Sequence, residues 1–148
     1  MPLYYMDPTI EGISLSWSSI ENRACLIGRC FRYCHMSMFR AEAGPKQPGF
    51  QKLIDLLRHG EGRAWVKFTG THRMAPPFAD AAPMAGALIA TAPDRLIWGS
   101  DYPHPHLSFA DKVGSVQLFN LLADWAPDEE TRPRILVDNP AALFGFSR

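Results

Sequence analysis

Two short apolar segments with one helical segment between them constrain the fold of this chain more than any other feature of its sequence. Ala64–Thr69 and Arg95–Trp98 are rich in bulky side chains and are short enough to be buried strands. Between them, Phe78–Thr91 carries Met84 and Leu88 at helical spacing on an apolar stripe. This order predicts two adjacent parallel strands, because such a crossover returns the chain to the same sheet with the helix packed outside it.

Further segments extend this pattern in both directions. A short strand is predicted near Cys30–Cys34, and Phe50–Arg58 has the apolar periodicity of an amphipathic helix. Val113–Trp125 predicts another helix, and a last helix is expected from Pro127 to Pro140, after which the apolar residues 141–146 are expected to dock on the body. The fold class predicted from this order is α/β, with parallel strands and helices packed outside them.

Length and charge exclude several classes of protein. A chain of 148 residues, 47% of them hydrophobic and 20% charged, is sufficient for one folded domain with a core. Its 15 basic and 15 acidic side chains cancel, so the net charge gives no reason to expect nucleic acid or an anionic membrane as a partner. No segment is apolar over the length of a membrane-spanning helix, and a cytoplasmic location is the expectation.

Three cysteines and a histidine near the N-terminus raise the question of a zinc site. Cys25, Cys30, Cys34 and His35 offer the thiolate and imidazole ligands that zinc binds. Their spacing lacks the paired cysteines of common structural zinc sites, and the adjacent Cys34 and His35 would point to opposite faces of a strand. Because three cysteines cannot all pair within one chain, a disulfide framework is not expected either. A zinc site in this cluster is the less favoured interpretation.

Polar side chains follow each predicted strand at its carboxyl end. His35 follows the first strand, His72 and Arg73 follow the second, and Asp101 follows the third. In parallel sheets the carboxyl ends of the strands lie at one edge, where ligands bind and catalytic groups are found. The sequence therefore predicts that His35, Arg73 and Asp101 face one cleft.

The loop after Asp101 is stiff because of its prolines. Tyr102-Pro103-His104-Pro105-His106 excludes both helix and ladder pairing, since proline lacks the backbone N–H. One interpretation is that a carboxylate and two imidazoles are held at the mouth of the sheet, with His104 and His106 lining a pocket. The other is that Asp101 caps local amides of an ordinary turn and that the histidines are solvated or structural.

Three segments carry a resemblance to a known family. Residues 65–70 (Trp-Val-Lys-Phe-Thr-Gly), 95–105 (Arg-Leu-Ile-Trp-Gly-Ser-Asp-Tyr-Pro-His-Pro) and 138–146 (Asp-Asn-Pro-Ala-Ala-Leu-Phe-Gly-Phe) resemble the C-terminal part of the amidohydrolase-related metal-dependent hydrolases. Within that family the likeness is greatest to the branch of 2-pyrone-4,6-dicarboxylate lactonase. It covers residues 35–146 and implies a (β/α)8 TIM barrel, of which this chain would supply the last three strands.

The resemblance also implies roles for single residues. Asp101 stands where the family has an aspartate that acts as general base toward water or as a metal ligand. His35 resembles a histidine that binds metal or polarises the substrate carbonyl. Arg73 matches an arginine that pairs with a substrate carboxylate, a task suited to a planar guanidinium. His72 and His104 are further candidates for substrate binding. The resemblance leaves the cofactor open between none and a divalent metal such as zinc.

The first 34 residues depart from the family pattern. The family opens with a His-x-His motif on its first strand, and nothing in residues 1–34 resembles it. We therefore expect a divergent leader over 1–34 and a truncated barrel portion over 35–148. The implied function is hydrolysis of a lactone, or another cyclic ester, of a small carboxylated substrate through water activated by Asp101. The alternative is a non-catalytic fragment that is inactive or that pairs with a partner, such as a second copy, through an open barrel edge.

Overall fold

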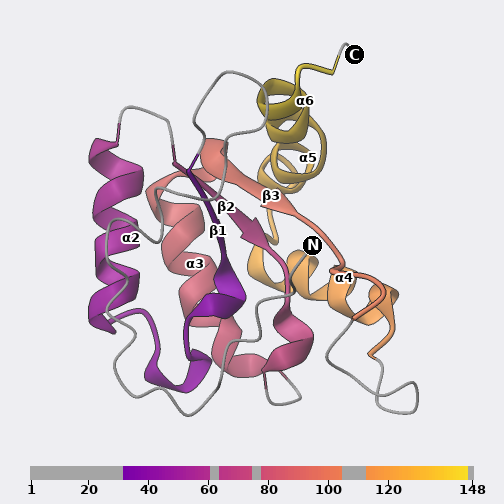
Figure 1. The fold of residues 1–148 in the computed structure, drawn as a ribbon. Coiled ribbons are helices and arrows are strands. Elements are labelled where there is room, and N and C mark those ends of the chain that lie inside the picture. Colours follow the sequence, from indigo (N-terminus) through magenta and orange to yellow (C-terminus); the bar gives the residue numbers. More distant parts are fainter. Residues whose placement is uncertain (1–31, 61–63, 75–77, 105–112, 147–148) are drawn as a thin grey trace, which may run out of the picture.

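The structure, a computed structural model, describes residues 32–60, 64–74, 78–104 and 113–146. Strands and helices alternate along these residues, and the helices lie around a small sheet (Figure 1). None of the described helices is long and apolar enough to cross a membrane. The elements are β1 (Arg32–His35), α2 (Pro48–His59), β2 (Ala64–Phe68), α3 (Ala82–Thr91), β3 (Leu96–Trp98), α4 (Ser115–Trp125), α5 (Thr131–Pro133) and α6 (Asn139–Phe144).

The three described strands form one parallel sheet in the order β1-β2-β3. The register aligns Cys34 with Val66 and His35 with Lys67 across the first pair, and Lys67 with Ile97 across the second. The prediction that the two strands flanking α3 are adjacent and parallel is confirmed. The α/β fold class is confirmed for the described residues, whereas closure of a complete barrel stays an expectation.

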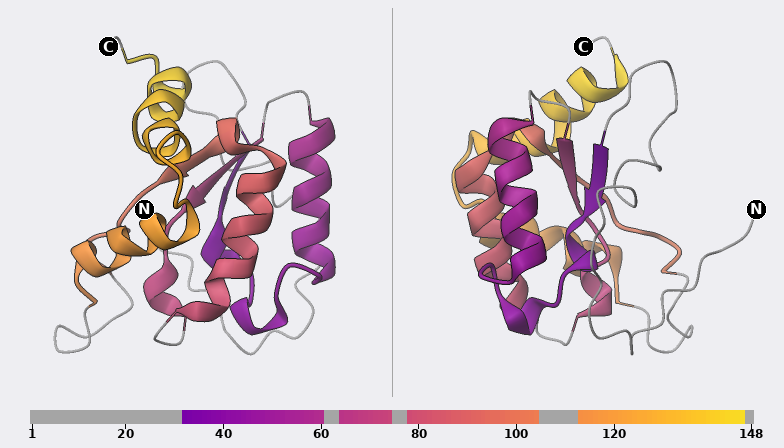
Figure 2. Two further views of the ribbon diagram at one scale, coloured as in Figure 1. Left: turned by 180° about the vertical axis from the view of Figure 1, so that it is seen from behind. Right: turned by 60° about the vertical axis from the view of Figure 1, so that its left-hand side comes forward.

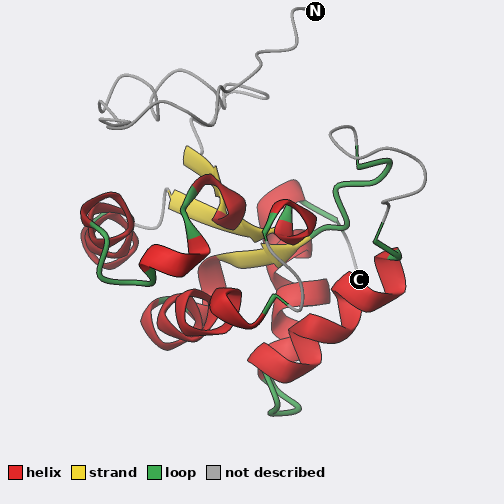
Figure 3. Cartoon of the chain, turned by 90° about the horizontal axis from the view of Figure 1, so that it is seen from below, coloured by secondary structure: helices red, strands yellow, loops and turns green. Residues whose placement is uncertain are grey.

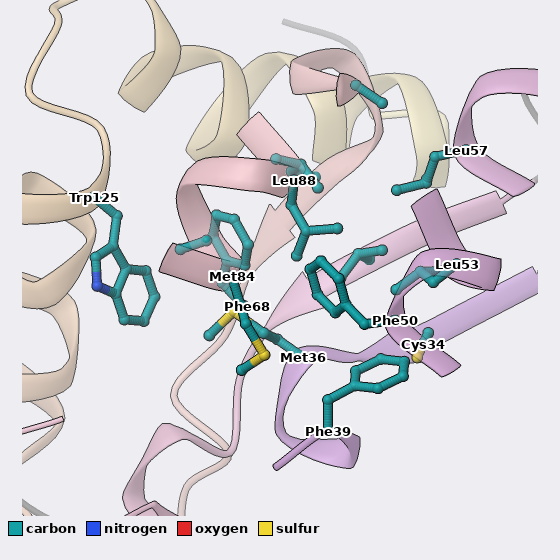
Figure 4. Close-up of a cluster of buried hydrophobic side chains, with 14 of the residues drawn as sticks. Cys34, Met36, Phe39, Phe50, Leu53, Leu57, Phe68, Met84, Leu88 and Trp125 are labelled. Atoms are coloured by element: carbon teal, nitrogen blue, oxygen red, sulfur yellow. The ribbon is translucent and has the colours of Figure 1, made fainter. Parts of the chain in front are cut away.

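Helices α2 and α3 cover one face of the sheet (Figure 2). Alternate residues of β2 point to this face, where Val66 and Phe68 are almost completely buried. Helix α2 contributes Phe50 to the same core, helix α3 contributes Leu88, and Trp125 at the end of α4 packs its ring edge to face against Phe68 (Figure 4). Burial of each such large apolar side chain stabilises the fold by about 2 kcal/mol. The helical periodicity of the sequence thus locates the core correctly.

Helix α3 begins later than its sequence predicts. The expected helix started at Phe78, but Phe78 has a left-handed backbone, with φ of 68°, and Ala79–Ala81 forms a short 3-10 turn before α3 starts at Ala82. Pro83 lies in the first turn of α3, where its missing N–H has no helical partner to lose. The proline therefore belongs to the start of the helix rather than to its interior.

The C-terminal helical segment differs from its prediction at both ends. Pro127 does not begin a helix; instead the Asp128 carboxylate accepts hydrogen bonds from the backbone N–H groups of Glu130 and Thr131, at 3.1 and 2.6 Å, where α5 starts. A π-helical turn over Arg134–Asp138 then leads into α6. This wider turn lies before Pro140. Proline has no N–H to donate to the preceding turn, and its ring crowds the backbone of that turn. The helix consequently continues beyond Pro140.

The expectation that residues 141–146 dock on the body is wrong for their aromatic side chains. Phe144 is 58% exposed and Phe146 is 65% exposed, and their rings lie against each other with centroids 5.8 Å apart. Apolar composition predicted burial, but α6 contacts the sheet through Asn139 at its start and directs its later aromatic residues outward. Figure 1 shows α6 at the margin of the fold.

Candidate functional site

The carboxyl ends of the three strands lie at one edge of the sheet. Because the strands are parallel, the segments that follow them emerge on the same side. These segments are the 3-10 turn Met36–Met38 after β1, the 3-10 turn Thr71–Arg73 after β2, and the loop containing Asp101 after β3. Seen from below, the short helical turns lie in front of the strands (Figure 3). The predicted site residues His35, Arg73 and Asp101 thus share one edge.

Asp101 is held in a tight turn directly beyond β3. Its backbone is left-handed, with φ of 59°, a conformation that aspartate tolerates better than most residues. The N–H of His104 donates to the Asp101 carbonyl at 2.8 Å, and the N–H of Tyr102 donates to the Ser100 hydroxyl at 3.2 Å. The Asp101 side chain remains 25% exposed. The turn therefore fixes a carboxylate that water can still reach.

His72 and His104 lie behind this carboxylate, inside the protein. His72 Nε2 is 3.8 Å from Asp101 Oδ2, and the His72 side chain has no exposed surface. The His104 ring lies against the His72 ring, with centroids 4.7 Å apart, and its Nε2 is 3.0 Å from the Ser100 carbonyl oxygen. Because a carbonyl only accepts, Nε2 of His104 carries a proton. The interpretation of solvated histidines is wrong for His104, which is 2% exposed; His106 lies outside the described residues.

His35 ends β1 on the face of the sheet opposite to the helices. It is partly buried, and burial is the largest cause that lowers the pKa of its imidazole below 6.5. The positive charges of Lys67 and Arg73 lower the pKa further, whereas the Asp101 carboxylate raises it. These influences place all three charged groups within electrostatic range of one imidazole. The net lowering favours a neutral His35 at physiological pH.

Arg73 projects from the 3-10 turn after β2 into solvent. Gly70 begins this turn with φ of 73°, and a side chain there would collide with Ser37 of the turn after β1, so glycine is required on both grounds. The Arg73 guanidinium is exposed and makes no hydrogen bond or ion pair within the residues that the structure describes. It is available to an anionic ligand at this edge.

Lys67 is a residue of this edge that sequence reasoning missed. It is aligned with His35 in the sheet register, so the two side chains leave neighbouring strands on the same face. Its ammonium lies 2.8 Å from the position that a Cβ on Gly99 would occupy. A signal was present in the sequence, because Lys67 is the single charged residue inside the apolar segment Ala64–Thr69.

The described residues do not provide a metal site by themselves. No group of three or more His, Cys, Asp or Glu side chains among them is arranged to hold a metal ion. Cys34 points into the core, away from the face that carries His35, and burial raises the pKa of its thiol to about 12. A protonated thiol is a poor zinc ligand. Cys25 and Cys30 lie outside the described residues, as does most of the proposed leader, although β1 crosses its expected boundary at residue 34.

Parallel strands joined by helices, with a carboxylate, imidazoles and cations at the carboxyl edge, define an α/β protein of the kind that carries enzyme sites at that edge. A model of the amidohydrolase family matches residues 28–146, and this chain belongs to that family. The family assignment confirms the resemblance derived from the sequence and implies a TIM-barrel architecture.

Three relatives show the range of this similarity. The chain is 44% identical to 4-sulfomuconolactone hydrolase of Hydrogenophaga intermedia over 75% of its length and 37% of that protein. It is 38% identical to D-galactarolactone isomerase of Agrobacterium fabrum over 70% of its length and 35% of the relative. The crystal structure of a Pseudomonas putida protein, proposed to be a 2-pyrone-4,6-dicarboxylic acid hydrolase, superposes on this chain with a TM-score of 0.66 and 32% sequence identity. The match covers 78% of this chain and 42% of that one. The chain thus spans less than half the length of these relatives.

Proposed function

We propose that this chain acts as a hydrolase on a lactone, or another cyclic ester, of a carboxylated substrate, with Asp101 activating the attacking water. The observation that carries the proposal is the Asp101 carboxylate itself, which is fixed by a tight turn, partly exposed and within electrostatic range of His35. The relatives named as a sulfomuconolactone hydrolase and a galactarolactone isomerase support a lactone as the substrate class.

In the proposed reaction, Asp101 accepts a proton from water while the water oxygen bonds to the lactone carbonyl carbon. The ring C–O bond then breaks, and the proton on Asp101 passes to the departing ring oxygen. The product is an open chain with one new carboxyl group and one new hydroxyl group. A neutral His35 donates a hydrogen bond to the carbonyl oxygen as negative charge develops there.

Arg73 and the buried histidines have separate roles in this proposal. The exposed Arg73 guanidinium binds a carboxylate of the substrate through two parallel hydrogen bonds. His72, whose side chain is fully buried next to the Asp101 carboxylate, holds that carboxylate in place and does not itself contact substrate. His104 supports His72 through ring contact. Substrate binding by His72 and His104, the prediction from the sequence, is thereby replaced with an indirect role.

The test is an absorbance assay of the purified chain with 2-pyrone-4,6-dicarboxylate and with 4-sulfomuconolactone. We expect slow hydrolysis of at least one of them. Asp101→Asn should lower kcat by about 100-fold or more, since a general base contributes about 10² to 10⁴. Asp80→Asn, which changes an exposed carboxylate before α3, is the matched control and should keep the full rate. Absence of lactone hydrolysis, or full activity in Asp101→Asn, would contradict the proposal.

A non-catalytic role is the second candidate. It is favoured by the two outer strands, β1 and β3, of the described sheet. Unpaired strand edges promote association with another chain. Light scattering after size-exclusion chromatography distinguishes a monomer from a dimer. An inactive dimer would favour pairing through the strand edges, and a monodisperse monomer would count against it.

A further inference from the structure

Lys67 occupies a central position on the face of the sheet opposite to α2 and α3, between the buried side chains of Trp65 and Ile97, and is itself only partly buried. Its neighbour Phe68 points into the core, so Lys67 points to the opposite face. The register aligns it with His35 on β1 and with Ile97 on β3. Neighbouring strands lie about 4.8 Å apart, and aligned residues share a face. Lys67 therefore stands between the strand that carries His35 and the strand that leads to Asp101.

Gly99 makes room for the Lys67 side chain at the end of β3. A Cβ on Gly99 would collide with Lys67 Cε and lie 2.8 Å from its Nζ. Positive φ does not explain the glycine, because Gly99 is not among the residues with a left-handed backbone. The absence of a side chain at this position therefore lets Lys67 cross β3 toward the loop of Asp101. The ammonium is held at the carboxyl edge and is not directed along the strand toward the other end.

The Lys67 ammonium has no counter-charge within the described residues. It makes no hydrogen bond or ion pair there, and the Asp101 carboxylate pairs at 3.8 Å with His72 instead. A bound anion stabilises a partly buried ammonium such as that of Lys67, because burial removes part of the hydration of the ammonium. Arg73 is the second cation that influences His35, and it projects from a different strand end. The edge thus presents two separate cations to a ligand.

We infer that Lys67 is an anion-binding residue of this site, which binds a second carboxylate or sulfonate of the substrate while Arg73 binds the first. This inference rests on the proposed function, since it describes the substrate of the same site. It makes the substrate a lactone with two anionic groups. Lys67 is a determinant of specificity, because a substrate with one anionic group leaves its ammonium unpaired.

The simpler alternative is that Lys67 extends along the sheet only to bring its charge to water. Long charged side chains do this on many apolar surfaces. In that case the stem contributes packing, and replacement by the uncharged Met would affect all ligands alike. The two explanations therefore predict different selectivity for ligands that differ only in charge.

The experiment measures binding by calorimetry to the full chain carrying Asp101→Asn, which prevents turnover. The probes are 2-pyrone-4,6-dicarboxylate and a 2-pyrone with a single carboxylate. In this background, Lys67→Met should weaken binding of the dicarboxylate by about ten-fold or more, as loss of a charge-assisted hydrogen bond does. It should weaken binding of the monocarboxylate by less than about two-fold. Lys67→Arg should restore most of the preference. Gly99→Ala, which displaces the ammonium, should reproduce the loss, whereas Gly86→Ala, with open space around its Cβ, should not.

Two results would overturn the inference. One is equal weakening of both pyrones, or of neither, by Lys67→Met; the other is no measurable binding of the dicarboxylate to the Asp101→Asn chain. Circular dichroism of each variant checks that the fold is retained. Turnover by the unmodified chain is measured in parallel, so a chain that distinguishes the probes but hydrolyses neither would contradict the proposed function and leave the inference on Lys67 standing.

Discussion

His35, His72 and His104 carry the same imidazole in three different surroundings, and their surroundings decide what each can do. His35 is partly buried and subject to charges of both signs. His72 has no exposed side-chain surface and lies beside a carboxylate, and the Nε2 proton of His104 is directed to the Ser100 carbonyl. Of the three, only His35 is partly exposed. It is therefore the histidine suited to contact a substrate.

The pKa of His35 provides the first prediction at this scale. Lys67→Met should raise the pKa of His35, because the ammonium disfavours the imidazolium, and Asp101→Asn should lower it, because the carboxylate stabilises the imidazolium. The measurement is an NMR titration of the histidine ring signals, with His35 assigned through His35→Gln. Lys52→Met removes an exposed charge from α2 and should leave the titration of His35 unchanged. An unchanged titration in Lys67→Met would contradict the prediction.

Single residues of the site were predictable from sequence to different degrees. Asp101 follows a strand inside a distinctive segment, so its position at the carboxyl edge could be predicted. The burial of His72 and His104 could not, because it arises from contact between two loops that are distant in the sequence. Lys67 was missed because an isolated charge in a strand does not reveal which face it points to until the core face is known. Its register with His35 supplies that information.

At the scale of elements, Asn139 connects the C-terminal helices to the sheet. Its side-chain amide donates to the carbonyl oxygens of Pro93 and Leu96, at 2.8 and 2.6 Å, and the residue is 4% exposed. These bonds join the start of α6 to the start of β3. The strand that leads to Asp101 is thereby fixed at the end opposite to the site.

Replacing Asn139 with Ala should destabilise the fold by about 2 to 4 kcal/mol, because the buried Leu96 carbonyl and the partly buried Pro93 carbonyl lose their donor, at about 1 to 3 kcal/mol for an unsatisfied buried group. Urea denaturation followed by circular dichroism measures the change. Asn120→Ala, at an exposed position of α4, is the matched control and should change stability by less than about 0.5 kcal/mol. A loss no larger than that of the control would show that the helix is anchored in another way.

The elements themselves were largely predictable, and their boundaries less so. Apolar periodicity located α2, α3 and α4, because each helix buries one side in the core, and short apolar segments located β2 and β3, which bury residues on both faces. It failed at Pro127, where the Asp128 cap delays the helix, and at Pro140, where a π turn lets the helix continue. These differences depend on hydrogen bonds of particular backbone groups, which periodicity does not describe.

At the scale of the whole molecule, the three described parallel strands and their helices have the α/β arrangement of a TIM barrel, the architecture that the amidohydrolase family implies. A barrel has no free strand edges, whereas the described sheet ends in β1 on one side and β3 on the other. The carboxyl edge of these strands collects the Asp101 carboxylate, the imidazoles of His35, His72 and His104, and two cations. Groups that other strands of a barrel would add around a substrate are not provided by the described residues.

The last prediction concerns the rate that these 148 residues can reach. A general base accelerates a reaction fully only when the substrate is held in position and the surrounding dipoles are fixed beforehand. We expect the purified chain to hydrolyse lactones at least about 100-fold more slowly than the Hydrogenophaga intermedia hydrolase does, in parallel assays on 4-sulfomuconolactone. The Asp101→Asn variant of this chain gives the background rate. A rate equal to that of the longer relative, lost in Asp101→Asn, would contradict this expectation.

Repeating the assay over a range of chain concentrations would then show whether a second copy of the chain contributes groups to the site, because activity per chain would rise with concentration.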